Sequence, residues 1–244
     1  MQFLRAISGP ALRLWGFSTL LAWGVFLVTR CVLLAHAMVV GQQSLDTLLP
    51  ALAAGLARDV PVAAVVALPW PIFELVFRQK WRERLRWPLF LVYLFTLLFV
   101  AGNLILPQLC HLIPQGGLIL LPIYFFTLIA AYKFGIRVGL LTAVLSPLAN
   151  SALFGMPAAA VLPEILIKSV TLAVAAAMAA RYLKNVSLLA MVAVVLTYQI
   201  IGSLFEWVLT GSFLTAMQDF RLGVPGMLLQ IVAGYALLKW LAKR

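Results

Sequence analysis

Long apolar stretches separated by short polar connections run along the whole chain. The clearest example is residues 111–137, where a polar and Gly-rich connection at 114–117 precedes an apolar run at 118–132. Lys133 and Arg137 close this run. About 20 apolar residues are needed to cross the hydrocarbon core of a bilayer, so such runs are typical of membrane-spanning helices. Because open strand edges are not tolerated in lipid, the pattern predicts an all-α polytopic membrane helical bundle.

Eight spans are predicted in alternating directions. The first two, residues 14–28 and 62–77, flank a short outer helix at 48–57 that residues 58–61 interrupt. The other six are residues 89–106, 118–132, 138–153, 165–180, 187–209 and 224–241. Ser146-Pro147 and Asn150 fall inside the span 138–153, so we expect that helix to be broken. Residues 210–221 are predicted to be an outer connection.

The basic residues predict the orientation of these spans. Residues 78–86 carry five positive charges against Glu83, which predicts a basic cytoplasmic loop. Of the 18 Lys and Arg residues, four lie elsewhere, which leaves 14 on one side; the four are Arg30, Arg58, Lys168 and Arg221. Short cytoplasmic connections are enriched in Lys and Arg. We therefore expect a multi-pass cell (inner) membrane protein with both termini in the cytoplasm.

Composition agrees with this pattern. The chain is 64% hydrophobic and only 10% charged, whereas soluble domains carry about 25% charged residues. The polar surface is too small to cover a water-facing globule, so lipid is the expected solvent. The net charge of +11 would indicate nucleic acid as a partner of a soluble protein. Here it follows from the basic inner connections, and no nucleic-acid binding is expected.

Sequence motifs of common enzymes are absent. No G-x-x-x-x-G-K-[ST], H-E-x-x-H or G-x-S-x-G occurs, so we expect no catalytic residue, no metal site and no cofactor. Any ATP hydrolysis that drives transport must then come from partner subunits. Cys31 and Cys110 lie far apart without nearby ligands, which favours two small apolar residues over a metal site. Whether they form a disulfide stays open.

Residues 86–244 resemble the substrate-binding S component of energy-coupling factor (ECF) transporters. The likeness rests on six short motifs: Gly102-Asn103, residues 113–117, Leu121-Pro122-Ile123, residues 131–135 with Gly139, Leu145-Ser146-Pro147 and Gly155-Met156-Pro157. The resemblance implies a six-helix domain that captures a vitamin or similar small-molecule micronutrient on the outer side. It also implies docking, among membrane lipid, onto a transmembrane coupling subunit and two ATPase subunits.

Two features depart from that family. Its members usually lack the first two spans, and residues 89–106 have no clean small-xxx-small docking pattern; Ala175-x-x-x-Ala179 occurs later instead. Residues 1–80 are similar to the membrane region of lipoteichoic-acid-synthase-type phosphoglycerol transferases. The expected domains are therefore residues 1–85, with two accessory N-terminal spans, and the S-component-like residues 86–244.

Ionisable groups inside spans are the best candidates for a substrate site, because burying a charge in lipid is expensive. Glu164 and Lys168 are four residues apart, which places them on one helical face. They form either a structural ion pair or an outer binding pair, in which Lys168 meets an anionic group and Glu164 a hydrogen-bond donor. Both interpretations are open from the sequence.

Gln199, Glu206 and Trp207 form a second candidate group. Gln199 and Glu206 share a helical face, and the adjacent indole suits a flat ligand that stacks on a ring. The alternative is an interfacial Trp beside a solvated Glu. Asn150 offers an amide at the predicted helix break, or it is a turn residue next to Pro147.

His111 and Gln115 lie on the outer loop that borders the site in the resemblance. An incidental position in an exposed loop is the alternative for His111. The sequence leaves three functions open. The first is an S subunit of an ECF-type importer. The second is a membrane-embedded transferase, or its accessory subunit, in lipid-linked envelope glycan or phosphoglycerol metabolism. The third is a purely structural membrane partner.

Overall fold

The computed structural model describes residues 9–40, 45–67, 79–183 and 185–242. These residues form helices and connections, without a strand among them. The chain divides into two compact units, Met1–Leu94 and Phe95–Arg244. The predicted domain boundary at residue 85 stays a prediction.

Unit 1 contains a helical hairpin of α2 (Gly9–Val40) and α3 (Leu45–Val66), followed by the first part of α5 (Gln79–Cys110). Indole N–H groups on α2 tie the two helices together: Trp15 Nε1 donates to the Ala64 carbonyl (3.4 Å) and Trp23 Nε1 to the Leu56 carbonyl (3.3 Å). Arg30 Nη2 donates to Asp59 Oδ1 at 2.8 Å. These contacts explain why α2 and α3 pair along most of their length.

Two sequence predictions about unit 1 are wrong. Helix α3 runs through residues 58–61 without the predicted break, because Asp59 is buried and its charge is paired with Arg30 inside the hairpin. The basic segment after residue 78 is not a loop but the first turns of α5. Its Lys, Arg, Glu and Gln residues are good helix formers. The predicted second span, 62–77, extends into residues 68–78, which lie outside the described residues.

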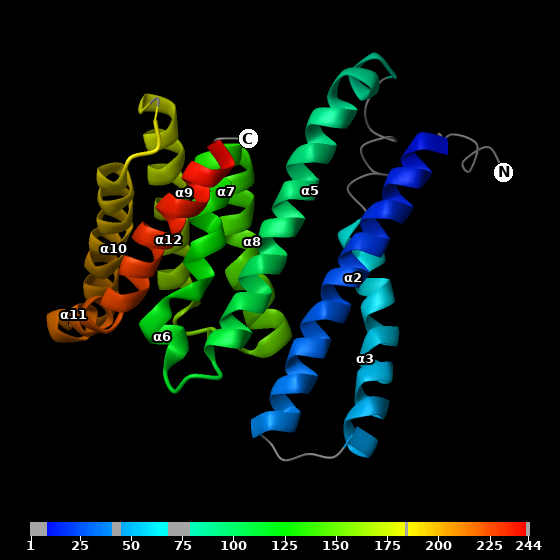
Figure 1. The fold of residues 1–244 in the computed structure, drawn as a ribbon, viewed down its shortest axis with the longest axis horizontal. Coiled ribbons are helices and arrows are strands. Elements are labelled where there is room, and N and C mark those ends of the chain that lie inside the picture. Colours follow the sequence, from blue (N-terminus) through cyan, green and yellow to red (C-terminus); the bar gives the residue numbers. More distant parts are fainter. Residues whose placement is uncertain (1–8, 41–44, 68–78, 184, 243–244) are drawn as a thin grey trace. The chain divides into compact units, whose positions relative to one another are not determined.

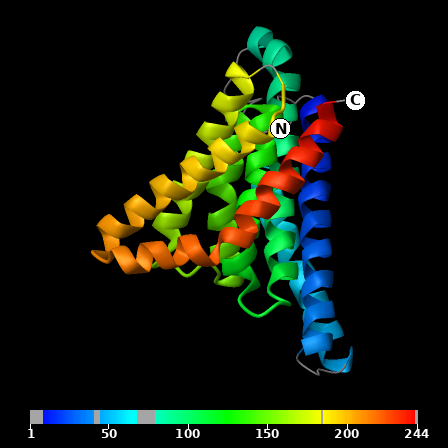
Figure 2. The ribbon, with the colours of Figure 1, turned by 60° about the vertical axis from the view of Figure 1, so that its left-hand side comes forward.

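Unit 2 contains the end of α5 and all later helices. These are α6 (Gly116–Leu120), the 3-10 turn η1 (Pro122–Tyr124), α7 (Phe125–Phe134), α8 (Ile136–Phe154), α9 (Leu162–Tyr182), α10 (Leu188–Thr210), α11 (Phe213–Leu222) and α12 (Val224–Ala242). Helix α9 packs on α7, α8 and α10, while α12 packs on α6, α7 and α10 (Figure 1). Helix α11 lies across the ends of α10 and α12, as Figure 1 and Figure 2 both show.

Six segments among the described residues are long and apolar enough to cross a membrane: Arg84–Cys110, Gly116–Phe134, Ile136–Phe154, Leu162–Tyr182, Leu188–Thr210 and Val224–Ala242. They coincide with the last six predicted spans. The protein is therefore a polytopic helical membrane protein. The apolar stretch Trp15–Val28 of α2 is shorter. The two N-terminal spans, and with them the total of eight, stay a prediction.

The break expected in the span 138–153 lies in the preceding span instead. Helix α8 continues through Pro147, and Asn150 Nδ2 donates to the Ser146 carbonyl inside it (3.0 Å). The span Gly116–Phe134 is interrupted at Leu121, which adopts φ 48 between α6 and η1. Pro122 disfavours a helical Leu121. The Leu121 carbonyl accepts from the Tyr124 backbone N–H (3.3 Å) and from Gln230 Nε2 on α12 (3.4 Å).

Residues 213–222, predicted as part of an outer connection, form the helix α11. Its apolar residues recur at positions 213, 216, 217 and 220, a spacing that gathers them on one helical face. Apart from Leu214, the positions between are polar, so the segment has the amphipathic pattern of a helix that lies at a membrane surface. The sequence pattern did not predict this helix, because it was searched for membrane spans and ten residues are too few to cross a membrane.

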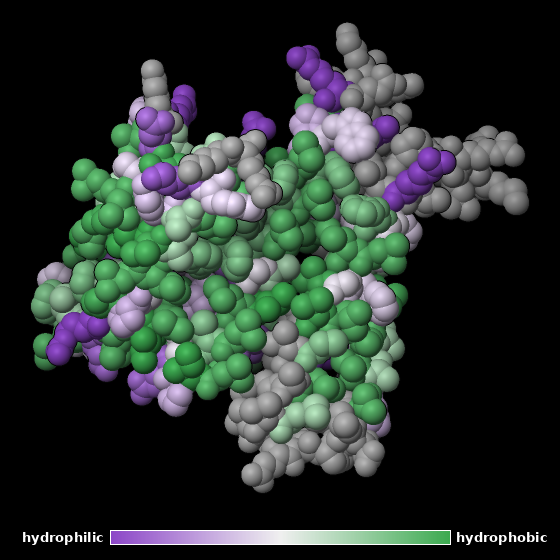
Figure 3. All heavy atoms as spheres, viewed as in Figure 1, coloured by the Kyte–Doolittle hydropathy of each residue, from purple (hydrophilic) through white to green (hydrophobic). Residues whose placement is uncertain are grey.

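The surface of unit 2 is apolar over the length of its helices. Figure 3 shows a broad hydrophobic band there, with hydrophilic residues gathered near the two ends of the helices. Side chains such as Val208, Leu214 and Val232 are 79%, 82% and 61% exposed. A soluble protein does not leave so many large apolar side chains in contact with water. The band is the lipid-facing surface that the composition requires.

Candidate functional site

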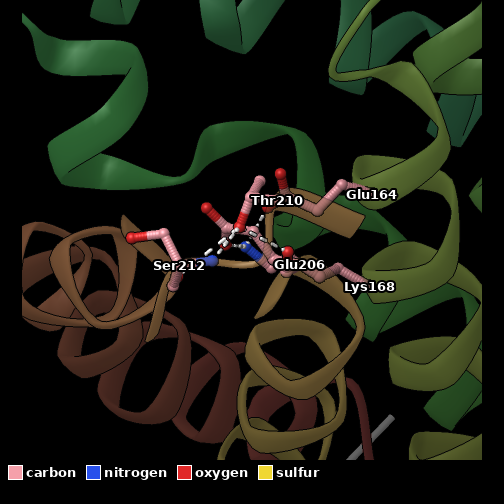
Figure 4. A network of polar contacts seen from close by, with 5 residues as sticks. All are labelled: Glu164, Lys168, Glu206, Thr210 and Ser212. Carbon is pink, nitrogen blue, oxygen red and sulfur yellow. Dashed lines mark hydrogen bonds and ion pairs between the residues drawn. The ribbon is translucent and has the colours of Figure 1, made fainter. Parts of the chain in front are cut away.

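A lysine buried between two glutamates lies near one end of the helices of unit 2. Lys168 on α9 is 1% exposed, and its Nζ donates to Oε1 of Glu164, one turn earlier on the same helix. The same Nζ lies 3.4 Å from Oε2 of Glu206 on α10. Figure 4 shows the three side chains meeting between the two helices. The predicted pairing of Glu164 with Lys168 is present, and Glu206 joins it.

Gly202 provides the space through which Lys168 reaches Glu206. A Cβ built on Gly202 would meet Cγ of Lys168 and would lie 2.6 Å from its Cε. The methylene groups of the lysine therefore lie directly against the backbone of α10. This close approach buries the apolar part of the side chain while its ammonium group reaches both carboxylates. A side chain at position 202 would displace the lysine.

The end of α10 supports Glu206 from the other side. Thr210 Oγ1 donates to the Glu206 carbonyl (2.8 Å) and accepts from the Ser212 backbone N–H (3.3 Å), as Figure 4 shows. Gly211 caps the helix at φ 67, a left-handed conformation that glycine adopts without a steric penalty. The chain thus turns from α10 into α11 one helical turn after Glu206.

The three charged side chains carry two negative charges and one positive charge when all are ionised. Glu206 is 6% exposed, and the Glu164 side chain is 16% exposed. Buried charges in a membrane protein are rare and are kept where they bind, pair or move ions. The cluster can bind a polar ligand group by charge and hydrogen bonding. It can also serve as a structural link between α9 and α10, so geometry alone leaves both sequence interpretations open.

A pocket of about 260 Å³ lies between α10 and α11. Each helix contributes one face at a spacing of three and four residues. Its lining residues are Ile200, Ser203, Leu204 and Trp207 from α10, and Phe213, Ala216, Met217 and Phe220 from α11. The Trp207 indole and the Phe213 ring meet edge to face, 5.5 Å apart. Glu206 is not among the lining residues, because Gly202 and Glu206 face α9 while the lining residues of α10 face α11.

Asn150 belongs to a different polar network, between α5, α7 and α8. It is 1% exposed, and its Nδ2 donates to the Asn103 carbonyl at 2.9 Å. Asn103 Nδ2 in turn donates to Thr127 Oγ1 (3.0 Å) and Ser146 Oγ (3.1 Å). The structure thus gives Asn150 a role in joining helices. It does not bring Asn150 into the Lys168 cluster.

Gln199 lies two turns before Glu206 on the same face of α10. Its side chain is fully buried, and neither of its amide atoms has a hydrogen-bond partner among the described residues. The neighbouring Tyr198 donates its hydroxyl to Gln230 Oε1 on α12 (3.0 Å). A buried amide without a partner is uncommon in native structures, so Gln199 remains a candidate for contact with a bound molecule or water.

His111 and Gln115 lie in the connection between α5 and α6. Gln115 is exposed and precedes α6 with φ 56. His111 lies against Gly117, where an added Cβ would come within 2.8 Å of its Nε2. Both residues therefore occupy the predicted loop, and their contact with a ligand stays a prediction.

Two structural polar residues were missed in the sequence: Asn103 and Gln230 were not singled out as site residues. Each is a lone amide in an otherwise apolar span and is fully buried. A polar side chain at membrane depth is itself a signal of a specific partner. That signal identifies the residue but not its partners, which lie 24 to 109 residues away along the chain.

Within the described residues, no group of three or more His, Cys, Asp or Glu side chains is placed to hold a metal ion. Comparison with known protein families, with curated proteins and with solved structures finds no match to this chain.

Proposed function

We propose that this chain is the substrate-capture subunit of an energy-coupling factor type importer. It binds a vitamin or similar micronutrient on the outer side of the membrane and passes it inward. A transmembrane coupling subunit and two ATPase subunits supply the energy. The observation that carries the proposal is the buried contact of Lys168 with Glu164 and Glu206 in a membrane-spanning helix bundle, where the helix that carries Glu206 also lines an aromatic pocket. A concave apolar pocket beside a few converging polar groups is the usual form of a small-molecule site.

The distribution of basic residues supports an outward-facing site. Lys133, Arg181 and Lys239 stand at the C-terminal ends of α7, α9 and α12. Glu164 stands in the first turn of α9, and Glu206 near the end of α10, so the cluster lies at the opposite end of these antiparallel helices. Basic residues favour the cytoplasmic side. This assignment directs the cluster and the pocket toward the outside.

The proposal is tested by extracting whatever small molecule copurifies with the protein from its native membrane and identifying it by mass spectrometry. We expect one tightly held, vitamin-like compound that is lost in Lys168→Ala and in Glu206→Ala. The matched control is Lys239→Ala, because Lys239 is an exposed lysine whose Nζ donates only to the Tyr235 hydroxyl among the described contacts. It should retain the compound.

Other outcomes would support the two alternative functions. Turnover of a lipid-linked glycan or phosphoglycerol donor by the purified chain alone would support the transferase alternative. A structural role would be supported if the purified chain holds no ligand and has no activity, and if deleting it disrupts a complex of other membrane proteins. Either result would overturn the importer proposal.

A further inference from the structure

The first turns of α5, residues 79–86, carry a dense group of basic residues. Four of these eight residues are positively charged and one is negatively charged. Lys80 and Arg84 stand four positions apart on the helix. Arg82 and Arg86 repeat that spacing, at which like charges repel each other. The N-terminal end of a helix also carries a partial positive charge, which disfavours cations there. The stability of the helix itself therefore does not explain the basic group.

The acidic residues of the chain are too few to balance its basic residues. The chain has 18 Lys and Arg residues against 7 Asp and Glu residues, so a net charge of +11 remains whichever ion pairs form. Asp59 contacts Arg30, and the two glutamates of the site described above contact Lys168. These pairs leave four acidic residues for the other 16 basic ones. Most of the balancing negative charge must therefore come from outside the chain.

The length of α5 places its basic turns at the membrane surface. The helix has 32 residues, and at about 1.5 Å per residue it is about 48 Å long, against about 30 Å for the hydrocarbon core of a bilayer. Its membrane-crossing segment begins at Arg84. Residues 79–86 cover about the first 12 Å of the helix. Because charged side chains are costly inside the hydrocarbon core, these turns lie at the depth of the lipid headgroups and just beyond it.

Trp87 stands at the boundary between the basic turns and the apolar part of α5. It directly follows Arg86 and is 62% exposed. Its ring meets the Phe90 ring edge to face, with 5.9 Å between the centroids. Tryptophan is enriched where headgroups meet acyl chains, and lysines and arginines near such a boundary direct their charged ends toward the headgroups. An exposed indole at this position favours a lipid surface over a soluble acidic partner.

We propose that residues 79–87 form a binding surface for anionic phospholipids. The Lys and Arg residues contact the phosphates of the headgroups, and Trp87 holds the helix at the edge of the acyl chains. Each basic residue next to a membrane span is expected to strengthen the attraction to anionic lipid by about fivefold. This surface is independent of the proposed capture function, because it involves none of the residues of the Lys168 cluster or of the pocket.

The test is native mass spectrometry of the purified full-length chain in detergent, mixed with equal amounts of phosphatidylglycerol and phosphatidylcholine. We expect phosphatidylglycerol to bind about tenfold or more tightly than phosphatidylcholine. The preference should fall as the salt concentration rises, because salt screens the attraction. Combining Lys80→Gln, Arg82→Gln and Arg84→Gln should remove most of the preference.

The matched control combines Arg137→Gln, Arg181→Gln and Lys239→Gln, which neutralise three exposed basic residues at other helix ends. It removes the same charge from the chain and should keep the preference. Thermal unfolding followed by helical circular dichroism checks that both combined variants are folded. If a variant does not fold, the two lipids and the salt series on the wild-type chain still decide the question.

Equal binding of the two lipids by the wild-type chain would overturn the inference, as would an equal loss of preference in the two combined variants. Tighter binding of inorganic phosphate than of phosphatidylglycerol would mean that residues 79–87 bind a free anion. Tighter binding of a polyglutamate peptide would mean that they bind an acidic protein. Either result would also overturn the lipid assignment, and neither would affect the capture function.

Discussion

The contact between Lys168 and its two carboxylates makes a quantitative prediction about stability. Lys168→Met keeps most of the volume of the side chain and removes the ammonium group. Glu164 and Glu206 then lose the ammonium group that both contact, at 16% and 8% side-chain exposure. Removing one partner of a buried ion pair costs about 3–5 kcal/mol. We expect the free energy of unfolding to fall by about that amount.

Glu206→Gln alone also removes one of the two contacts of the lysine, but Glu164 remains. The double variant lacks both the Lys168 ammonium group and the Glu206 carboxylate, so it contains fewer unbalanced buried charges than the two single variants would suggest. The double variant should therefore lose less stability than the sum of the single losses, by about 1–3 kcal/mol. The measurement is equilibrium unfolding in mixed micelles of dodecyl maltoside and sodium dodecyl sulfate, followed by helical circular dichroism.

Lys239→Met serves as the control, because this lysine is exposed and should change stability by no more than about 0.5 kcal/mol. Strictly additive losses in the Lys168 and Glu206 variants would refute the reasoning. They would mean that the two side chains do not interact in the membrane protein, and that the contact between α9 and α10 does not depend on charge.

Three further predictions use single substitutions. Gly202→Ala should destabilise by about 1–3 kcal/mol because its methyl group displaces Lys168, whereas Gly24→Ala, with no atom within 4 Å of its Cβ, should not destabilise the protein. Asn103→Ala removes the two hydrogen bonds that its Nδ2 donates to the buried Thr127 and Ser146 hydroxyls and should lower the unfolding free energy by at least about 2 kcal/mol, against less than about 0.5 kcal/mol for the exposed Thr197→Ala. Ala216→Phe should fill the pocket and abolish retention of the copurified compound, as mass spectrometry would detect; full retention would contradict that assignment.

The membrane-spanning architecture could be read from the sequence because lipid imposes a strong local rule. A span needs about 20 apolar residues and must satisfy its own backbone hydrogen bonds. The last six spans follow from that rule with small errors at their ends. The pairing of Glu164 with Lys168 was also predictable, since helical geometry brings residues four apart together.

The positions of the helix breaks were not predictable, because they depend on distant contacts. Pro147 and Pro122 both stand in apolar segments, yet only the segment with Pro122 breaks. There the side chain of Gln230 on α12 donates to the Leu121 carbonyl, and Gly226 leaves room for the backbone of Leu120. Around Pro147, the polar side chains of Ser146 and Asn150 form hydrogen bonds with Asn103 on α5. Local sequence does not encode either outcome.

The contact of Glu206 with Lys168 could not be predicted from the sequence, for a similar reason. Glu206 follows Lys168 by 38 residues, and only the packing of α10 on α9 joins them. Residue spacing placed Glu206 on one helical face with Gln199 but did not distinguish a buried Glu206 from a solvated one. It gave no sign that Gly202 would let the lysine reach across. The amphipathic helix α11, which forms half of the pocket, was likewise not predicted, because its segment is too short to cross a membrane.

In the proposed capture function, the Lys168 cluster and the pocket between α10 and α11 bind one ligand together. This is tested by stripping the copurified compound from the wild-type chain and rebinding it, with stoichiometry and affinity measured by isothermal titration calorimetry. We expect one molecule bound per chain, with affinity lost in Lys168→Met and in Ala216→Phe but kept in Lys239→Met. Rebinding that is equally strong in all three variants would contradict it.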